Sequence, residues 1–465
     1  MRFDLHEMAD RLGGRLAGSE PPAEGVNGLA IDSRTVSAGQ LFAALEGGRD
    51  GHDFVAAARG AGAAAALVSR VVDDAPSLVV PDVATALRAL AGWARTRLPD
   101  PVVGITGSVG KTTTKDLLAA ALGTTFRTTA SQRSFNNELG VPLTLANAPD
   151  DTEVTVVEMG ARGPGHIALL CDMARPTVGV VTAVHAVHTE VMGDLDDIAA
   201  AKAELVEALP ADGLAVLNAD DPRVSAMGDR GPAPVLFFGR SPAADVRAGP
   251  VEVDEDLRAR FTLESPWGGT EVHLGARGAH NVHNALAAAS VALWAGVEPA
   301  AVGEGLARPP ESPLRMQLHR CRGGRLVLDD SYNAGPASME AALLALAELP
   351  ARRRVAVLAT MAELGSREGD EHSRVASLAA ELGVSVVSVG TDLYGSQGNA
   401  PVELSVPATG DGAGRTDAQR VVREMDSAGM LESGCAVLVK GSRVAGLDAV
   451  SESLVEFLGH EPEGG

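Results

Sequence analysis

One segment near position 106 limits the folds open to this chain more than any other. The apolar run Val102 to Ile105 leads directly into TGSVGKTT at 106–113, and a helical pattern continues from Thr113 to Leu122. A strand, a glycine-rich turn ending in Lys-Thr and a helix are the context that a phosphate-binding loop requires. Glycines let successive backbone N–H groups turn toward an anion, and the helix N-terminus adds its positive end. The segment therefore predicts nucleotide binding on an α/β fold.

The side chains of this loop suggest specific roles. We expect Lys111 to reach the outer phosphates and Thr112 to ligate Mg²⁺. The loop departs from the strict GxxxxGK[ST] pattern, because Ile105 stands where the first glycine would be. The alternative is a glycine-rich turn without a ligand. The residues that we expect to hold the nucleotide at this loop are Gly107, Ser108, Gly110, Lys111, Thr112 and Thr113.

Two proline-containing breaks divide the chain, whose 465 residues are too many for one hydrophobic core. The breaks are 98–101 and 309–313, so the expected domains span residues 1–98, 99–312 and 313–465. Apolar runs alternate with helical patterns in the second and third segments, which predicts βαβ units and mostly parallel sheets. The expected fold class is α/β, with a small N-terminal domain, a central domain carrying the phosphate loop, and a Rossmann-like C-terminal domain.

Several apolar runs end in chemically capable side chains. Glu158 follows one run, and His185 and His188 follow the next. In the third segment, comparable runs lead to Asp329 and Asp330, to Glu363, and to Lys440. Because ligands of open α/β sheets bind outside the carboxyl ends of the strands, this pattern predicts two sheets whose carboxyl edges face a shared cleft.

Charge and cysteine usage exclude several classes of function. A net charge of -22 repels nucleic acid and anionic membrane surfaces, so an anionic ligand must be held by a local site. The three cysteines, Cys171, Cys321 and Cys435, have no metal-binding or CxxC spacing, which fits a reducing compartment. Neither a signal peptide nor a membrane span is predicted. We expect a cytoplasmic protein that binds no nucleic acid, does not insert into membranes and is a monomer.

A series of motifs resembles the Mur ligase family over essentially the whole chain. In the middle segment the motifs are TGSVGKT at 106–112, NNELGVP at 136–142, EMG at 158–160, HTE at 188–190, KAEL at 202–205 and GAHNVHN at 278–284. In the third segment they are DDSYNA at 329–334, MAELG at 361–365 and KGSR at 440–443. The motifs of the third segment are similar to those of the branch of the family that adds D-alanyl-D-alanine to a UDP-linked muramoyl tripeptide. The first segment, with DSR at 32–34, resembles the UDP-binding domain of the same branch.

The resemblance implies an ATP-dependent ligase that forms an acyl phosphate and joins the carboxylate to an amine. It implies two Mg²⁺ ions held by Thr112, Glu158, His188 and Lys202, the last as a carbamate. His185 competes with His188, but the HxE alignment favours His188. The implied catalytic residues are Lys111, Lys202, His188 and Arg315.

The resemblance also implies further ligand contacts. Arg315 would reach the γ-phosphate and Asp330 the ribose. For Asn281 and Asn284, which lie one helical turn apart, adenine contact and capping by Asn281 are both open. The expected substrate contacts are Ser33, Arg34, Asn137, Asn333, Glu363 and Lys440.

Three other functions stay open at this point. One is the sister ligase that adds a diamino acid or lysine, although its DNPR string is absent. Another is a folylpolyglutamate-type ligase, which lacks the first domain. The third is a non-catalytic nucleotide-binding homologue, because Val191-Met192 and Ala359-Thr360 depart from the family pattern.

Overall fold

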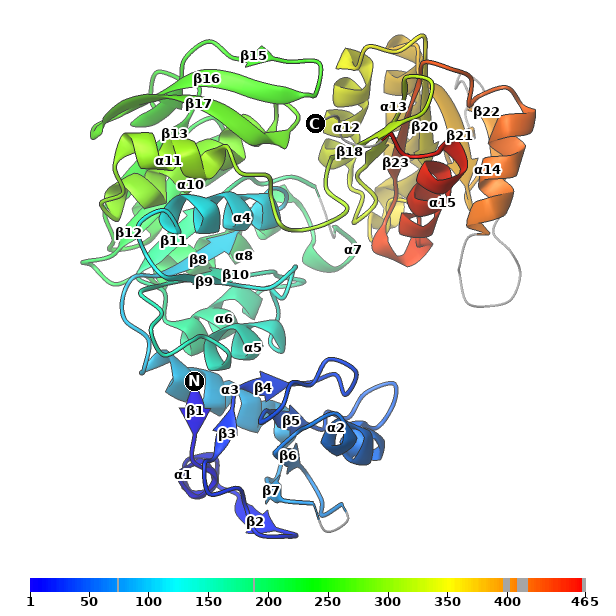
Figure 1. The fold of residues 1–465 in the computed structure, drawn as a ribbon. Helices are drawn as coiled ribbons and strands as arrows, with labels where there is room; N and C mark the ends of the chain where they lie inside the picture. The colour runs from blue at the N-terminus through cyan, green and yellow to red at the C-terminus, as the bar shows by residue number, and fades with distance from the viewer. Residues whose placement is uncertain (73–74, 187–188, 396–401, 408–416, 462–465) are drawn as a thin grey trace.

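The computed structural model describes residues 1–72, 75–186, 189–395, 402–407 and 417–461. They form three α/β bodies (Figure 1). In Figure 1 the N-terminal domain, in blue, lies below the central domain, and the C-terminal domain, in yellow to red, lies beside the upper part of the central domain.

The N-terminal domain is built on a five-stranded sheet with the order β2-β7-β6-β5-β4, parallel except for β2. A separate antiparallel pair joins β1 to β3. The first helix begins where the Asp4 carboxylate accepts hydrogen bonds from the backbone N–H groups of His6 and Glu7. The elements are β1 (Arg2–Phe3), α1 (Leu5–Leu12), β2 (Arg15–Ala17), β3 (Val26–Asn27), β4 (Leu29–Ala30), β5 (Leu41–Ala43), η1 (Gly51–Phe54), α2 (Val55–Gly60), β6 (Ala65–Val68), β7 (Ser77–Val79) and α3 (Val83–Arg95).

The central domain has a ten-stranded sheet. The strands from β9 to β14 are parallel in the order β9-β10-β8-β11-β12-β13-β14, and β15, β16 and β17 add an antiparallel edge. One apolar cluster joins one face of the sheet to α4, α10 and α11. The elements up to the helix that carries Lys202 are β8 (Val102–Thr106), α4 (Lys111–Leu122), β9 (Thr128–Ala130), α5 (Gly140–Ala146), β10 (Val154–Glu158), α6 (His166–Ala174), β11 (Val178–Val181), α7 (Thr189–Met192) and α8 (Leu195–Glu207). The remaining elements are β12 (Leu214–Asn218), α9 (Pro222–Ser225), η2 (Ala226–Arg230), β13 (Val235–Gly239), β14 (Val246–Ala248), β15 (Glu252–Val253), β16 (Arg258–Ser265), β17 (Gly268–Arg277), α10 (Asn281–Trp294) and α11 (Pro299–Leu306).

The C-terminal domain has a six-stranded sheet in the order β18-β19-β23-β20-β21-β22, parallel except for β18. Two apolar clusters fill the two faces of this sheet, one with α12 and α13 and the other with α14 and α15. The elements are β18 (Gln317–Cys321), β19 (Arg325–Asp329), α12 (Pro336–Glu348), β20 (Arg353–Leu358), η3 (Gly365–Arg367), α13 (Glu368–Glu381), β21 (Ser385–Val389), β22 (Val402–Val406), α14 (Ala418–Ser427), β23 (Cys435–Lys440), η4 (Arg443–Ala445) and α15 (Asp448–Leu458).

A single apolar cluster crosses the expected boundary at residue 98. It contains side chains of α1 and α3 together with Val141 and Leu145 of α5 and Ile167 and Leu170 of α6. The N-terminal domain therefore shares its core with one face of the central domain. Among the residues that the structure describes, the clusters of the C-terminal domain include only Leu257 from the central domain.

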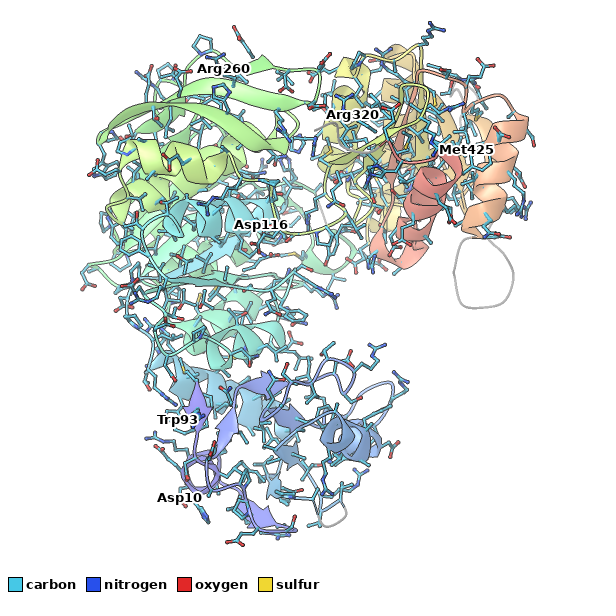
Figure 2. All side chains as sticks on the ribbon, in the orientation of Figure 1. Asp10, Trp93, Asp116, Arg260, Arg320 and Met425 are labelled. Carbon is cyan, nitrogen blue, oxygen red and sulfur yellow. The ribbon has the colours of Figure 1, made fainter. Side chains whose placement is uncertain are left out.

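The central and C-terminal domains are connected by the chain between α11 and β18. The backbone N–H of Ser312 in this connection donates to Asp116 Oδ2 in α4 at 3.0 Å. Figure 2 labels Asp116, whose other oxygen pairs with the buried Lys115 ammonium at 2.8 Å. The connection is thus attached to the helix that follows the phosphate loop. None of the helices that the structure describes is long and apolar enough to cross a membrane.

Candidate active site

The phosphate loop runs from β8 into α4, and its backbone requires glycine at two positions. Gly107 has φ of 148° and Gly110 has φ of 85°. A Cβ atom would lie 1.9 Å from Thr182 Oγ1 at Gly107, and 2.2 Å from Asn284 Oδ1 at Gly110. No side chain caps the first turn of α4, which begins at Lys111 rather than at Thr113 as the sequence pattern predicted. Its first N–H groups are therefore open toward an anion.

Residues of the neighbouring strand end fix the shape of the loop. Thr182 Oγ1 donates to the carbonyl of Val109 at 2.6 Å, and Ser108 Oγ donates to the carbonyl of His185 at 3.0 Å. The ammonium of Lys111 bends back onto the Gly107 carbonyl at 2.6 Å. Burial lowers the pKa of Lys111, Glu158 opposes the shift, and the Arg315 guanidinium adds to it. Thr182 did not emerge from the sequence patterns, because a lone threonine after a strand carries no motif.

Arg315 brings the C-terminal side of the cleft onto this loop. Its Nη2 donates to Thr112 Oγ1 at 2.9 Å, and its guanidinium carbon lies 4.3 Å from the centre of the Tyr332 ring. The Tyr332 hydroxyl in turn contacts Ser134 Oγ of the central domain. The structure brings Lys111, Thr112 and Arg315 together in one cleft, and their expected roles stay predictions. Tyr332, which belongs to the DDSYNA motif, and Ser134 also line the cleft, although neither was predicted as a site residue.

A buried carboxylate and a buried amine lie on the central side. Glu158, at the end of β10, is 1% exposed, and its Oε1 accepts from Asn136 Nδ2 at 2.9 Å. Among the residues that the structure describes, no group hydrogen-bonds Glu158 Oε2. Lys202 is 3% exposed, and burial, reinforced by the charge of Lys111, lowers its pKa to about 7. At neutral pH the Lys202 side chain is therefore an uncharged amine in a large fraction of the molecules.

The sequence pattern places the start of a helix at the KAEL motif, 202–205, and this prediction is wrong. The helix α8 begins at Leu195, because Asp194 and Asp197 form a capping box there. This places Lys202 within the helix, on its buried side. His188, expected as a metal ligand, lies outside the described residues. His185 lines the cleft, and burial lowers the pKa of its imidazole.

At the strand ends of the C-terminal sheet, a buried lysine pairs with a partly buried aspartate. The Lys440 ammonium, 2% exposed, pairs with Asp330 Oδ2 and donates to the Asn333 carbonyl at 3.0 Å. The backbone N–H of Met316 donates to Asp330 Oδ1 at 3.2 Å. His280 lines the same cleft. Lys440 thus holds Asp330 in place in this structure, and its expected substrate contact stays a prediction.

Asn281 and Asn284 lie on one face of α10 and line the cleft. Asn281 Nδ2 donates to the Arg277 carbonyl at 2.6 Å, and Asn284 Nδ2 donates to Asn281 Oδ1 at 2.6 Å. The N-cap of α10 is His280, without a side-chain hydrogen bond. Capping by Asn281 is therefore wrong, because its side chain bonds the preceding turn instead. Adenine contact stays a prediction.

The expected substrate residues fall into two places. Asn137, Asn333, Glu363 and Lys440 line the cleft, and Asn137 Oδ1 also accepts from the Gly140 N–H at 2.9 Å. Ser33 and Arg34 lie in the N-terminal domain, where Ile31 reaches the cleft wall. The Arg34 side chain is 81% exposed and forms an ion pair with Asp32 at 2.6 Å. Ser33 and Arg34 themselves are not among the described residues that line the cleft, and their expected substrate contacts stay predictions.

The cleft has a volume of about 1860 Å³ and is lined by the carboxyl ends of strands from both large sheets, as the sequence pattern predicted. It holds cations at Lys111, Arg315 and Arg367, together with carboxylates. Within the part of the chain that the structure describes, no three His, Cys, Asp or Glu side chains converge on one point. A metal held here would consequently need ligands from a substrate or from other residue types.

Comparison with known proteins finds three family models that match successive parts of the chain. The models for the Mur ligase family catalytic domain, the Mur ligase middle domain and the Mur ligase glutamate ligase domain match residues 25–92, 105–292 and 314–443. The UDP-N-acetylmuramoyl-tripeptide–D-alanyl-D-alanine ligase of Mycobacterium tuberculosis is 42% identical, over 98% of each chain.

Solved structures of similar proteins cover nearly the whole chain. MurF from Acinetobacter baumannii aligns with a TM-score of 0.84 at 28% identity, over 98% of this chain and 99% of that one. MurF ligase from Thermotoga maritima, in complex with ADP, aligns with a TM-score of 0.78 at 27% identity, over 93% and 98%.

Proposed function

The chain belongs to the Mur ligase family, and from that premise we propose that it joins D-alanyl-D-alanine to a UDP-N-acetylmuramoyl-tripeptide at the expense of ATP. The observation that carries this proposal is the similarity to ligases of that name over all three domains, including the N-terminal one. The product would be a UDP-linked pentapeptide, a precursor of peptidoglycan, with ADP and phosphate. The folylpolyglutamate alternative loses its support, because the first domain has the same relatives as the other two.

The loop at 107–113 would hold the ATP phosphates. Its open N–H groups and the start of α4 suit an anion, and Lys111 would leave the Gly107 carbonyl for the outer phosphates. Arg315 would leave Thr112 for the γ-phosphate as the two domains close. Asn281, Asn284 and Asp330 would hold the nucleoside end of ATP.

The reaction would proceed in two covalent steps. The terminal carboxylate oxygen of the tripeptide attacks the γ-phosphorus, the bond to the β-phosphate oxygen breaks, and ADP leaves. The amine of D-alanyl-D-alanine then attacks the carbonyl carbon of the acyl phosphate, phosphate leaves, and the amine gives up a proton. Lys111 and Arg315 would stabilise the negative charge that collects on the transferred group.

The donor set suits Mg²⁺. Glu158 offers the buried Oε2 atom, which lacks a partner among the described residues, and Thr112 offers a hydroxyl. We propose that these two residues, with His188 and Lys202, hold two ions together with the substrates. Bound Mg²⁺ would supply neutralisation of the phosphate and carboxylate charges.

We propose that Lys202 carries a carbamate. A primary amine reacts with CO₂ only when it is neutral, and the lowered pKa of Lys202 supports a neutral amine near pH 7. The carbamate would convert a buried amine beside Lys111 into an anion that attracts it. A carbamate signal in the ¹³C NMR spectrum of protein equilibrated with ¹³CO₂, present in the wild type and absent in Lys202→Met, tests this assignment.

The remaining assignments are proposals on the same basis. Ser33 and Arg34 would contact the UDP end, and Asn137, Asn333, Glu363 and Lys440 would contact the peptide parts. The domain limits would be 1–98, 99–312 and 313–465. We propose a monomer, which light scattering would test.

One assay tests the function. Mg²⁺-dependent phosphate release from ATP is measured with UDP-linked muramoyl tripeptide, with and without D-alanyl-D-alanine. We expect release that requires D-alanyl-D-alanine, and a pentapeptide product by mass spectrometry. Release only with the precursor dipeptide and a diamino acid would assign the chain to the sister branch, and ATP binding without release would favour a non-catalytic homologue.

A further inference from the structure

The placement of Arg315 depends on a short chain segment with unusual backbone geometry. Leu314 has φ of 62° and Met316 has φ of 52°, so residues in the left-handed region stand on both sides of Arg315. Side chains without special tolerance for this region adopt it only when surrounding contacts hold them there. The direction of the Arg315 side chain is therefore fixed by its anchors rather than by local preference.

Two of these anchors belong to the DDSYNA turn. The Asp330 carboxylate accepts from the Met316 N–H at 3.2 Å, and the Tyr332 N–H donates to the Leu314 carbonyl at 3.2 Å. The Tyr332 ring lies under the Arg315 guanidinium, with 4.3 Å between the guanidinium carbon and the ring centre. A cation above an aromatic face is attracted by the ring electrons, so the ring restricts where the guanidinium can lie.

The other end of Tyr332 reaches the central domain. Its hydroxyl contacts Ser134 Oγ, in a loop that also carries Ser131 and Asn136. Ser131 Oγ accepts from the Glu158 N–H at 3.1 Å, and Asn136 bonds the Glu158 carboxylate. A line of contacts thus runs from Thr112 through Arg315 and Tyr332 to the loop that holds Glu158.

We propose that Tyr332 is a positioning residue for this ligase. Its ring orients Arg315 toward the transferred phosphoryl group. Its hydroxyl, through Ser134, couples this orientation to closure of the C-terminal domain on the central domain. The inference rests on the proposed function and adds a residue to it. In this proposal Tyr332 acts on Arg315 and not on the reacting carboxylate or amine. Because its effect is transmitted through Arg315, replacement of Tyr332 should change kcat more than the affinity for the nucleotide.

The test compares variants by steady-state kinetics and by ADP affinity. Tyr332→Leu removes ring and hydroxyl, and we expect kcat to fall on the order of 100-fold, the typical effect of misplacing a catalytic group by about 1 Å. The Kd for ADP, measured by calorimetry, should stay within about threefold, because the phosphate contacts are on the central domain. A merely structural role would lower stability and leave kcat per folded molecule unchanged.

A double-mutant cycle tests the hydroxyl. Tyr332→Phe and Ser134→Ala should each lower kcat about fivefold, and the double variant should be no slower than either single variant, because both remove one contact. The chain has one other tyrosine, and Tyr394→Phe removes its hydrogen bond to the Ala359 carbonyl in the same domain. This matched control should keep kcat within about twofold.

Three results would overturn the inference: a kcat of Tyr332→Leu close to wild type, additive losses in the cycle, or an equal loss in Tyr394→Phe. If Tyr332→Leu fails to fold, the cycle carries the test alone. Failure of the wild type to make pentapeptide would instead refute the proposed function, so the two failures are distinguishable.

Discussion

Replacing Lys202 by methionine should abolish ligation and yet stabilise the protein. The side chain is 3% exposed and its pKa falls from 10.5 to about 7 on folding. Below pH 10.5 the unfolded chain therefore binds a proton that the folded chain binds less well, and folding must expel it. Methionine has a similar shape without this cost, so Lys202→Met should raise the free energy of unfolding.

The magnitude follows from the two pKa values. At pH 8 the pH lies 2.5 units below the unfolded pKa, so loss of the Lys202 proton lowers the free energy of unfolding by about 3 kcal/mol. At pH 10 this loss is less than about 1 kcal/mol. The free energy of unfolding of the wild type rises with pH between 7 and 10.5, because the unfolded state binds more protons than the folded state in this range. The gain in unfolding free energy from Lys202→Met is therefore largest below pH 7 and vanishes above pH 10.5.

The measurement is thermal unfolding of both proteins at several pH values, with chelator and in CO₂-free buffer so that no carbamate forms. The N-terminal and central domains share a core and are expected to unfold as one unit. For a unit of that size we expect the Tm of Lys202→Met at pH 8 to lie on the order of 5 °C above that of the wild type. A lower Tm for the variant, or a Tm difference that does not change between pH 8 and 10, would refute the reasoning.

Lys115 supplies a matched control. It is equally buried and lies in the same domain, but its ammonium pairs with Asp116 and donates to the Ser131 and Arg133 carbonyls at 2.8 and 2.9 Å. Lys115→Met leaves the buried Asp116 carboxylate without its cation and should cost about 3–5 kcal/mol. The same substitution should therefore have opposite signs at the two lysines.

Three further predictions concern the cleft and the thiols. Lys111→Ala should abolish ligation and weaken ATP binding, measured by phosphate release and calorimetry; retained turnover would refute the loop assignment. Glu158→Gln keeps an acceptor for Asn136 but loses the charge, so half-maximal activity should require roughly tenfold more Mg²⁺; an unchanged Mg²⁺ titration would contradict this role. Burial raises the pKa of Cys171 to about 12 and also that of Cys321 and Cys435, so alkylation at pH 8 should modify none of the three thiols in the native protein and all of them in denaturant, by mass spectrometry.

The sequence predicted those parts of the site that one continuous segment encodes. The phosphate loop, the strand-end Glu158 and the DDSYNA turn could be located because each is a short string with its own chemistry. The capping box at Asp194 was also legible, and would have placed the start of α8 correctly.

What could not be predicted depends on contacts between distant segments. Thr182 closes the loop from another strand, and Tyr332 meets Ser134 across the domain boundary. Similarly, the lowered pKa of Lys202 results from burial within the packed domain, which no local pattern specifies. Capping by Asn281, one of the two alternatives left open, does not occur, because the Asn281 side chain donates to the carbonyl of Arg277 instead.

The shared core beneath α3 limits how such proteins can exchange parts. A recombination event at residue 98 would pair the apolar faces of α1 and α3 with foreign α5 and α6 helices, and the misfit would lie inside a buried cluster. A recombination event at residue 313 would exchange the C-terminal domain, whose two apolar clusters are formed almost entirely by its own residues. Viable chimaeras between relatives should therefore inherit the first two domains together and acquire the third, with Arg315 and the DDSYNA turn, as one module.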